Sequence, residues 1–481
     1  MLLPLLLACT HRPTAPPTPA PIEVVTAGFV DAHGHPAGLG RSLTQLQLRD
    51  LPSLQATLAA VSTASETGEG WLLGRGWDQN DWPDHDGFPT AAQLDASVSE
   101  RPVALRRVDG HATWLNTAGL AAAGITAETP DPEGGRIIRG PDGAPSGVLV
   151  DAAAGLIPAQ PEPSLTERRR QLILGLDAIA AVGLTGVHDM GVGDAGLAAY
   201  EALDAEGVLK VRIFAYLSPD AAAVERLVAN GPWCGTRLCV VGVKAYADGA
   251  LGSRGALLGE AYTDEPSHSG LQIMPTTELE SLAIRLLGAR AQLAVHAIGD
   301  EGVHQVLDAF AAARAAVPEA AGVPLRVEHF QVARPEDVAR LVPLNVVASM
   351  QPTHATSDMP WAADRLGEAR IGWAYAWRDV LDAGAILAFG SDFPVEEVSP
   401  AFGFWAATTR TDRDGQPEGG WMPEQRLTFE EATHGFTGAT WDALGRSAPE
   451  GDATAWVVEE DGWRRPVRTV VGGEVIWQAA D

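Results

Sequence analysis

Eight short apolar runs alternate along this sequence with segments of helical periodicity, and this alternation narrows the possible folds sharply. The apolar runs have the length and composition of buried strands. They lie at residues 28–35, 185–190, 210–217, 238–248, 292–300, 324–331, 345–352 and 386–394. Segments between them, such as LTERRRQLILGLDAIAAV and DEGVHQVLDAFAAARAAV, have the period of helices. Eight buried strands with helical crossovers predict an α/β fold, a (β/α)₈ TIM barrel, rather than an open sheet.

One connection is much longer than the others. Residues 36–184 separate the first strand from the second, which predicts a large insertion on the first loop of the barrel. It contains GWDQNDWPDHDGFP and LRRVDGHATWLN, and long loops at the C-terminal rim of a barrel commonly build substrate pockets. We therefore predict a barrel domain over residues 22–440 that includes this pocket-forming insertion. Residues 441–481, with the run DATAWVVEEDGWRRPVRTVVGGEVIWQ, predict a small β appendage of two or three strands.

Residues 1–21 differ in composition from the rest of the chain. The apolar run MLLPLLLAC ends at Cys9, and the Pro/Thr-rich stretch after it is typical of an extended tether. So short a run cannot span a bilayer as a helix. It resembles, imperfectly, the end of a bacterial lipoprotein signal, which predicts a lipid anchor at Cys9 in the cell envelope. No Lys or Arg precedes the run, as a signal requires; a start codon assigned too late would explain this, and an accidental apolar start on a cytoplasmic enzyme is the alternative.

The charge balance excludes some classes of partner. The chain has 34 basic and 62 acidic residues, a net charge of −28, which argues against a nucleic-acid partner and against electrostatic attraction to anionic membranes. We expect a solvated surface and a small-molecule substrate, and nothing in the sequence indicates the oligomeric state. Of the three cysteines, Cys239 lies in an apolar run and favours a core position. A bridge between Cys234 and Cys239 would require an oxidising compartment.

Polar side chains occupy the ends of the predicted strands, where barrels build their active sites. His33 and His35 close the first strand and, being two residues apart, project to the same face. Any single buried histidine is more often a core residue held by a hydrogen bond. The other polar residues at strand ends are Lys244 on the fourth strand, His296 on the fifth, His329 on the sixth and Asp392 on the eighth. Four histidines and a carboxylate that converge on one barrel mouth predict a metal site.

Lys244 is unusual because the chain has only one other lysine, Lys210, whereas its remaining basic residues are all arginine. A charged amine is costly in a buried strand, so the pKa of Lys244 should fall and its neutral form should become accessible. A neutral amine can add carbon dioxide and become a carbamate, whereas the guanidinium of arginine stays protonated. The alternatives are a snorkelling side chain or a structural ion pair with Asp248.

The strand ends carry motifs that resemble those of a known superfamily. The runs FVDAHGHP, VKAYADGALGSRGA, VHAIGDEG, RVEHFQ, SMQPTHATSDMPW and FGSDFPVE are similar to those of the amidohydrolases. The branch is amidohydrolase family 3, which includes N-substituted formamide deformylases. The resemblance extends over residues 28–435, with agreement in motif order, strand assignment and residue type. The insertion, with GWDQNDW and RVDGHATWLN, also fits that branch.

This resemblance implies roles for the residues at the strand ends. His33 and His35 would bind one divalent metal ion, and His296 and His329 a second. Lys244 would be an N6-carboxylysine that bridges the two ions, and Asp392 would bind the first ion and also handle the proton. Members usually carry more β-strand before the first barrel strand, as half of a small sandwich. Only PIEVVTAGF follows the tether here, so the C-terminal strands are expected to lack their usual partners in a truncated β-sandwich.

The chemistry of such a site predicts a hydrolase. A water held between two divalent metals loses a proton near neutral pH and becomes a nucleophile, and Asp392 could pass that proton to a leaving amine. We expect hydrolysis of a C–N bond other than a peptide bond, in an amide, formamide or cyclic amide. Zinc is the first choice for these ligands, although manganese or iron also fits them. The alternatives are a lactonase or esterase on the same dinuclear site, or a tethered binding protein that has lost catalysis.

Four further residues are candidates for substrate binding. They are His111 in VDGHATW, His354 in QPTHATSD, Trp77 and Trp361. His354 has the strongest claim because it follows the seventh strand directly. The tryptophans could form the wall of an apolar pocket or simply pack within loops. His188 closes the second strand, where a structural hydrogen bond explains it as well as substrate contact does.

Overall fold

The computed structural model describes residues 22–66, 70–158, 163–459 and 464–480. The apolar run and tether of residues 1–21, with Cys9, lie outside these ranges, so the predicted lipid anchor stays a prediction. Within the described ranges, no helix is both long enough and apolar enough to cross a membrane.

Eight parallel strands form the centre of the molecule. They are β2 (Phe29–Gly34), β9 (Leu184–Val192), β10 (Arg212–Leu217), β12 (Leu238–Tyr246), β13 (Gln292–Ala297), β14 (Leu325–His329), β15 (Val346–Met350) and β16 (Leu387–Phe389). Each pairs with its neighbour in this order, and a parallel bridge between Gly34 and Phe393 brings the last strand back to the first. The predicted TIM barrel is confirmed, because each strand overlaps one of the eight apolar runs.

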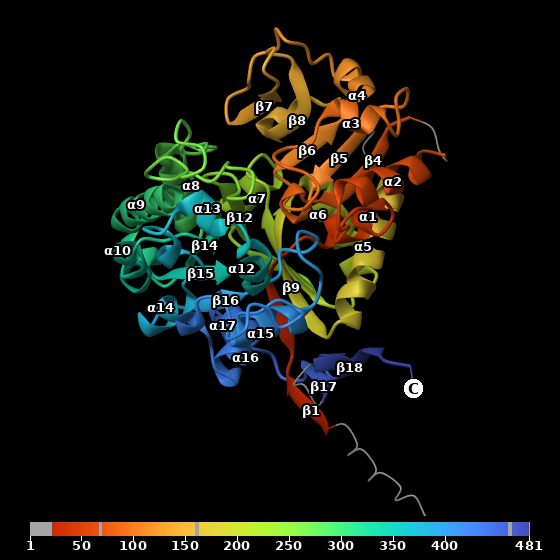
Figure 1. Ribbon diagram of the computed structural model, residues 1–481. Coiled ribbons are helices and arrows are strands. Elements are labelled where there is room, and N and C mark those ends of the chain that lie inside the picture. The colour runs from red at the N-terminus through yellow and green to blue at the C-terminus, as the bar shows by residue number, and fades with distance from the viewer. Residues whose placement is uncertain (1–21, 67–69, 159–162, 460–463, 481) are drawn as a thin grey trace, which may run out of the picture.

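Helices fill the connections and cover the outside of the barrel (Figure 1). The longer ones are α5 (Leu165–Ala181), α6 (Asp194–Ala205), α7 (Ala223–Asn230), α8 (Thr276–Gly288), α9 (Asp300–Ala316), α15 (Pro400–Thr409) and α16 (Phe429–Phe436). Shorter ones are α10 (Pro335–Val338), α11 (Leu341–Leu344), α12 (Pro352–Asp358), α13 (Ala362–Leu366), α14 (Trp377–Asp382) and α17 (Gly438–Asp442). Most of these helices pack against the strands in one large hydrophobic core, whereas Trp441 of α17 packs with strand residues in a separate cluster.

A close helix pair fixes the start of the insertion. Helix α1 (Pro36–Ser42) begins directly after His35 and packs against α5. A Cβ added at Gly40 would lie 1.7 Å from the carbonyl oxygen of Gln171, and one added at Gly175 would lie 2.3 Å from that of Pro36. Only glycine permits the two backbones to approach so closely. The packing of α1 against α5 thus holds His35, the residue before α1, at the mouth of the barrel.

The insertion is a folded unit rather than a set of loops. A mixed sheet runs in the order β3 (Leu46–Gln47), β4 (Leu72–Trp77), β5 (Val103–Arg107), β6 (Ala112–Leu115), β8 (Pro145–Asp151) and β7 (Gly135–Arg139). It carries α2 (Leu54–Ser65), α3 (Ala91–Asp95) and α4 (Thr117–Ala122). Because it follows β2, it lies at the C-terminal ends of the barrel strands, and Figure 1 shows it at the opposite end of the molecule from β1 and β17.

A small antiparallel sheet lies at that opposite end. Its order is β1 (Ile22–Ala27), β17 (Ala453–Val458), β18 (Arg464–Val471) and β19 (Glu474–Gln478). Strand β1 pairs with β17 over its whole length, so the short segment before the barrel supplies one partner for the C-terminal strands of this small sheet. Hydroxyl groups anchor this sheet to the barrel: Thr454 donates to the carbonyl oxygen of Gly183 at 2.7 Å, and Thr469 to that of Ala180 at 2.8 Å.

A disulfide joins two cysteines near the start of β12, the fourth barrel strand. Strand β11 (Trp233–Cys234) forms a hairpin with the start of β12, and Cys234 and Cys239 form a disulfide across it. Cys239 is half-buried rather than fully buried, and it packs against the edge of a core cluster inside the barrel.

Candidate metal centre and active-site cavity

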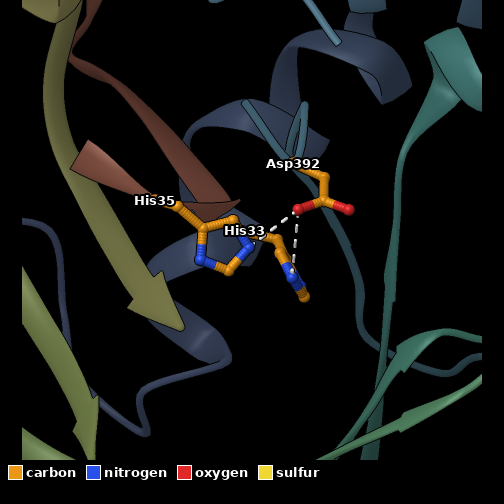
Figure 2. Close-up of side chains that lie close together, drawn as sticks. All are labelled: His33, His35 and Asp392. Atoms are coloured by element: carbon orange, nitrogen blue, oxygen red, sulfur yellow. Dashed lines mark hydrogen bonds and ion pairs between the residues drawn. The ribbon is translucent and has the colours of Figure 1, made fainter. Parts of the chain in front are cut away.

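Three predicted ligands meet at the C-terminal end of β2. Nε2 of His35 lies 2.9 Å from Oδ1 of Asp392, and Nε2 of His33 lies 3.6 Å from the same oxygen. Figure 2 shows both rings directed toward this carboxylate. One donor atom from each of the three residues lies within 4.8 Å of the others. His33 and Asp392 are buried and His35 is half-buried. The cluster is therefore shielded from solvent on one side and accessible on the side of His35.

Unusual backbone conformations turn two of the predicted ligands into the barrel mouth. His329, at the end of β14, has a φ of 73°, and Asp392, which follows β16, has a φ of 57°. Such left-handed conformations are uncommon for residues other than glycine, and they cost of order 1–3 kcal/mol. At His329 the turn breaks the strand alternation, so that its ring and the preceding Glu328 both lie against His33.

The closing pair of strands holds His33 and Asp392 together. The buried carboxylate of Asp31 accepts hydrogen bonds from the backbone NH of His33 at 3.0 Å and from the hydroxyl of Ser391 at 2.6 Å. The backbone NH of Asp392 donates to the carbonyl oxygen of His33 at 2.7 Å. Burial raises the pKa of Asp31 to about 7. These hydrogen bonds to the Asp31 carboxylate fix the spacing between His33 and Asp392.

The other two predicted histidine ligands lie beside His33. The rings of His296 and His329 are 4.5 Å apart between centroids, and those of His33 and His329 are 4.8 Å apart. Burial lowers the pKa of His296 and of His329 well below the ordinary value, so both are neutral near pH 7. Nδ1 of His329 donates to Oε1 of Gln351 at 2.8 Å, which leaves its Nε2 as a free lone pair, the state that a metal ligand needs.

A buried carboxylate that the sequence reading did not single out supports His33. Oε2 of Glu328 lies 2.6 Å from Nδ1 of His33, and its other oxygen accepts from Nε of Arg326 at 2.7 Å. Burial alone would raise the pKa of Glu328, but Arg326 and the hydrogen bond from His33 hold it below its usual value. The signal was present in the run RVEH, because Arg326 and Glu328 are two apart and share one face of a buried strand.

Lys244 reaches this cluster from β12. Its Nζ lies 3.3 Å from Nε2 of His33, and the residue is 1% exposed. Within the described residues, no carboxylate forms an ion pair with it. Asp248 instead accepts hydrogen bonds from the backbone NH groups of Leu257, Ile298 and Gly299, so the alternative of a Lys244–Asp248 ion pair is wrong. Burial lowers the pKa of Lys244 to about 8.

A cavity of about 1310 Å³ opens over these residues, and both the barrel and the insertion line it. The candidates His111, His354 and Trp361 are on its wall. Nε2 of His354 lies 4.0 Å from Oδ2 of Asp392 and has no hydrogen-bond partner within the described residues. Nδ1 of His111 lies 2.6 Å from Oδ1 of Asp151, and its ring centroid is 5.3 Å from that of His296.

Comparison with known proteins agrees with this geometry. A family model described as Amidohydrolase family matches residues 23–451. The chain belongs to the amidohydrolase family. Putative amidohydrolase YtcJ of Bacillus subtilis (strain 168) is 33% identical over 478 residues, which cover 95% of this chain and 89% of that protein. N-substituted formamide deformylase of Arthrobacter pascens is 27% identical over 458 residues, covering 90% and 82% of the two chains.

A solved structure also matches this amidohydrolase over most of its length. A metal-dependent hydrolase from Pyrococcus horikoshii OT3 superposes with a TM-score of 0.69 at 28% identity, covering 89% of this chain and 84% of that one. The family resemblance drawn from the motifs is thus confirmed, and the chain is a metal-dependent hydrolase of the amidohydrolase family.

Two of the candidate residues lie elsewhere in the amidohydrolase. Trp77 does not line the cavity; it is fully buried in the core of the insertion, where its indole NH donates to the carbonyl oxygen of Leu105 at 2.7 Å. Burial in that core removes the large apolar ring of Trp77 from water, which a position on a solvated cavity wall would not do. His188 lies inside the barrel, with Nδ1 2.6 Å from Nη1 of Arg326, so a structural hydrogen bond explains it.

Proposed function

We propose that the chain hydrolyses a C–N bond other than a peptide bond, in an amide, formamide or cyclic amide, with a metal-activated water. The observation that carries this proposal is the convergence of donor atoms from His33, His35 and Asp392 within 4.8 Å. The cavity over them can admit a small molecule to these donors. Nδ1 of His33 is held by Glu328, which directs the other ring nitrogen toward the shared carboxylate.

The donor set fits two divalent cations. His33, His35 and Asp392 offer two imidazoles and a carboxylate, and His296 and His329 offer two neutral imidazoles beside them. Imidazole and carboxylate ligands with an open position are typical of catalytic zinc, and manganese or iron accepts the same ligand types. When bound, such ions would activate a water molecule and polarise the scissile carbonyl.

Asp392 is the residue proposed to move the proton. Burial opposes its ionisation, but nearby His33 and the hydrogen bond to His35 hold the pKa of Asp392 well below its usual value. It can therefore accept a proton from the attacking water. As the water oxygen bonds to the carbonyl carbon and the C–N bond breaks, Asp392 returns that proton to the departing nitrogen. His354, with its Nε2 unpartnered on the cavity wall, would hydrogen-bond the substrate, and Trp361 would contact its apolar part.

Lys244 is proposed to supply a further ligand after modification. Its lowered pKa, about 8, makes the neutral amine accessible near neutral pH. The amine nitrogen would add to the carbon of carbon dioxide and lose a proton to solvent. This step would turn a cation beside His33 into an N6-carboxylysine anion with two oxygens, suited to hold both cations.

Metal analysis combined with a substrate panel tests the proposed function. The purified protein is expected to hold up to two equivalents of metal and to release amine from an N-formyl amine or N-acyl amino acid. A chelator should abolish this release and zinc should restore it. Hydrolysis of lactones alone would overturn the C–N assignment in favour of an esterase. Less than one metal per chain, with no hydrolysis at all, would favour a binding protein.

A further inference from the structure

Two arginines of the insertion lie side by side, and neither forms an ion pair within the described residues. Arg75 on β4 and Arg106 on β5 are direct partners in the register of the two strands, and both line the cavity over the candidate metal centre. Like charges directly opposite one another on a sheet are destabilising. The pair therefore lowers the stability of the fold unless an anion binds to the two guanidinium groups.

The hydrogen bonds of the two guanidinium groups go to backbone oxygens. Arg75 donates from Nη2 to the carbonyl oxygens of Pro394 at 2.6 Å and Val108 at 3.4 Å. Arg106 donates from Nε to that of Gly110 at 3.0 Å. Within the part of the chain that the structure describes, neither arginine forms an ion pair with a carboxylate. This is unexpected in a chain with 62 acidic and 34 basic residues.

Three acidic residues of the cavity wall are engaged with other cations. Arg107, next to Arg106 in the chain and also on the cavity wall, forms ion pairs with both Asp78 and Asp109. Glu396 forms one with Arg49. Within the described residues these carboxylates do not pair with Arg75 or Arg106, so both arginines can meet an anion from outside the chain.

The pair is close to the reacting centre. The carbonyl oxygen that Arg75 binds belongs to Pro394, two residues after Asp392. Tyr246 lines the same cavity as the two arginines. The ring of Tyr246 is tilted against that of His296, at 5.5 Å between ring centroids. A group bound by the pair would thus lie over the same mouth as the candidate ligands.

We propose that Arg75 and Arg106 form a subsite for a carboxylate of the substrate, so that the substrates are amides that carry a carboxylate near the scissile C–N bond, N-acylated amino acids being the simplest. The planar fork of an arginine matches a carboxylate with two parallel hydrogen bonds. Arg75 is half-buried and already fixed by two carbonyl groups, so little order is lost when it binds. This subsite rests on the proposed function only for the identity of the scissile bond.

A pair of formamides that differ only by a carboxylate tests the subsite. N-formylphenylalanine and N-formyl-2-phenylethylamine share the scissile bond and the aromatic group. We expect the parent to have a kcat/KM for the acid at least about tenfold higher, as loss of charged hydrogen bonds would cause. Arg75→Gln and Arg106→Gln should each bring this ratio toward one, and Arg106→Lys should keep part of it. Arg139→Gln, on β7 and outside the cavity lining, is the matched control and should keep the parent ratio.

Binding of N-formylphenylalanine to the full-length protein, measured by calorimetry, separates the two proposals. If neither formamide is hydrolysed but the acid binds and Arg106→Gln weakens binding about tenfold or more, the subsite stands and the proposed function fails. If both are hydrolysed with equal kcat/KM, or if Arg106→Gln keeps the parent ratio, the subsite is overturned and the proposed function stands. Absence of both hydrolysis and binding overturns the subsite together with the function.

Discussion

Nδ1 of His33 lies 2.6 Å from Oε2 of Glu328, and both side chains are buried beneath the barrel mouth. The carboxylate fixes the ring and places the proton on Nδ1, so that Nε2 faces Asp392 as a lone pair. Glu328 is itself held by Arg326. The orientation of one candidate ligand thus depends on a charge pair that does not reach the cavity.

Glu328→Gln should weaken metal binding by about 10- to 100-fold, the usual effect of removing the partner of a ligating histidine. The amide cannot accept from both Arg326 and the imidazole as strongly as a carboxylate does. Titration of chelator-stripped protein with zinc measures the change. Glu336→Gln, an exposed glutamate on α10, is the matched control. A Glu328→Gln variant with parental affinity would show that His33 is oriented without its partner.

Asp392→Asn should lower kcat by about two to four orders of magnitude, because the variant loses the proton-transfer group. The backbone NH that bonds to His33 is retained, so the melting temperature of the metal-free protein should change little. Steady-state rates with an N-formyl amine measure the effect, and Asp382→Asn on the exposed end of α14 serves as control. Activity within tenfold of the parent would remove Asp392 from the proposed mechanism.

The barrel could be predicted from the sequence because its strands are apolar runs with polar ends, and His33, Lys244 and Asp392 lie at those ends. The sheet of the insertion could not, since its short strands are interrupted by glycine and charged residues that also suit loops. For the same reason the sequence left open a pocket wall or loop packing for Trp77, which lies in the core of the insertion. Glu328 was missed because His329 follows it directly, and strand alternation would direct only one of two neighbours toward the barrel mouth; the left-handed backbone of His329 cannot be read from the sequence.

The raised pKa of Asp189 predicts how the stability of the folded protein depends on pH. Burial raises the pKa of this β9 carboxyl to about 6, although the hydroxyl of Tyr200 donates to it at 2.7 Å. The folded state therefore binds the proton more tightly than the unfolded chain, whose pKa is near the ordinary value. The stabilisation is complete at low pH and is lost as the pH rises toward 6.

Asp189→Asn should remove this dependence while it keeps an acceptor for Tyr200. The melting temperature of the variant relative to the parent should therefore rise between about pH 4 and pH 6, and then level off. Thermal unfolding in a series of buffers measures it. Asp364→Asn, at an exposed position of α13, controls for the loss of one negative charge. A difference that falls over this interval would contradict the assigned direction of the pKa shift.

Substitutions of Lys244 distinguish a charged lysine from a carboxylated one. Arginine keeps the positive charge and much of the length of lysine, but its guanidinium cannot become a carbamate. Lys244→Arg should therefore lose bound metal and at least about a hundredfold in activity, in spite of the preserved charge.

Lys244→Ala removes the amine and leaves space beside Nε2 of His33, which Nζ approaches to 3.3 Å in the parent. A short carboxylic acid supplied in solution offers the same two oxygens as a carbamate, so it should restore part of the metal content and activity of Lys244→Ala. The same acid should not restore Lys244→Arg, because the longer side chain fills that space. Metal content and rates with and without added acid distinguish the two variants. A fully active Lys244→Arg protein, or an unmodified amine in the crystal structure of metal-loaded enzyme, would exclude the carbamate, since either result means that a cation suffices beside His33.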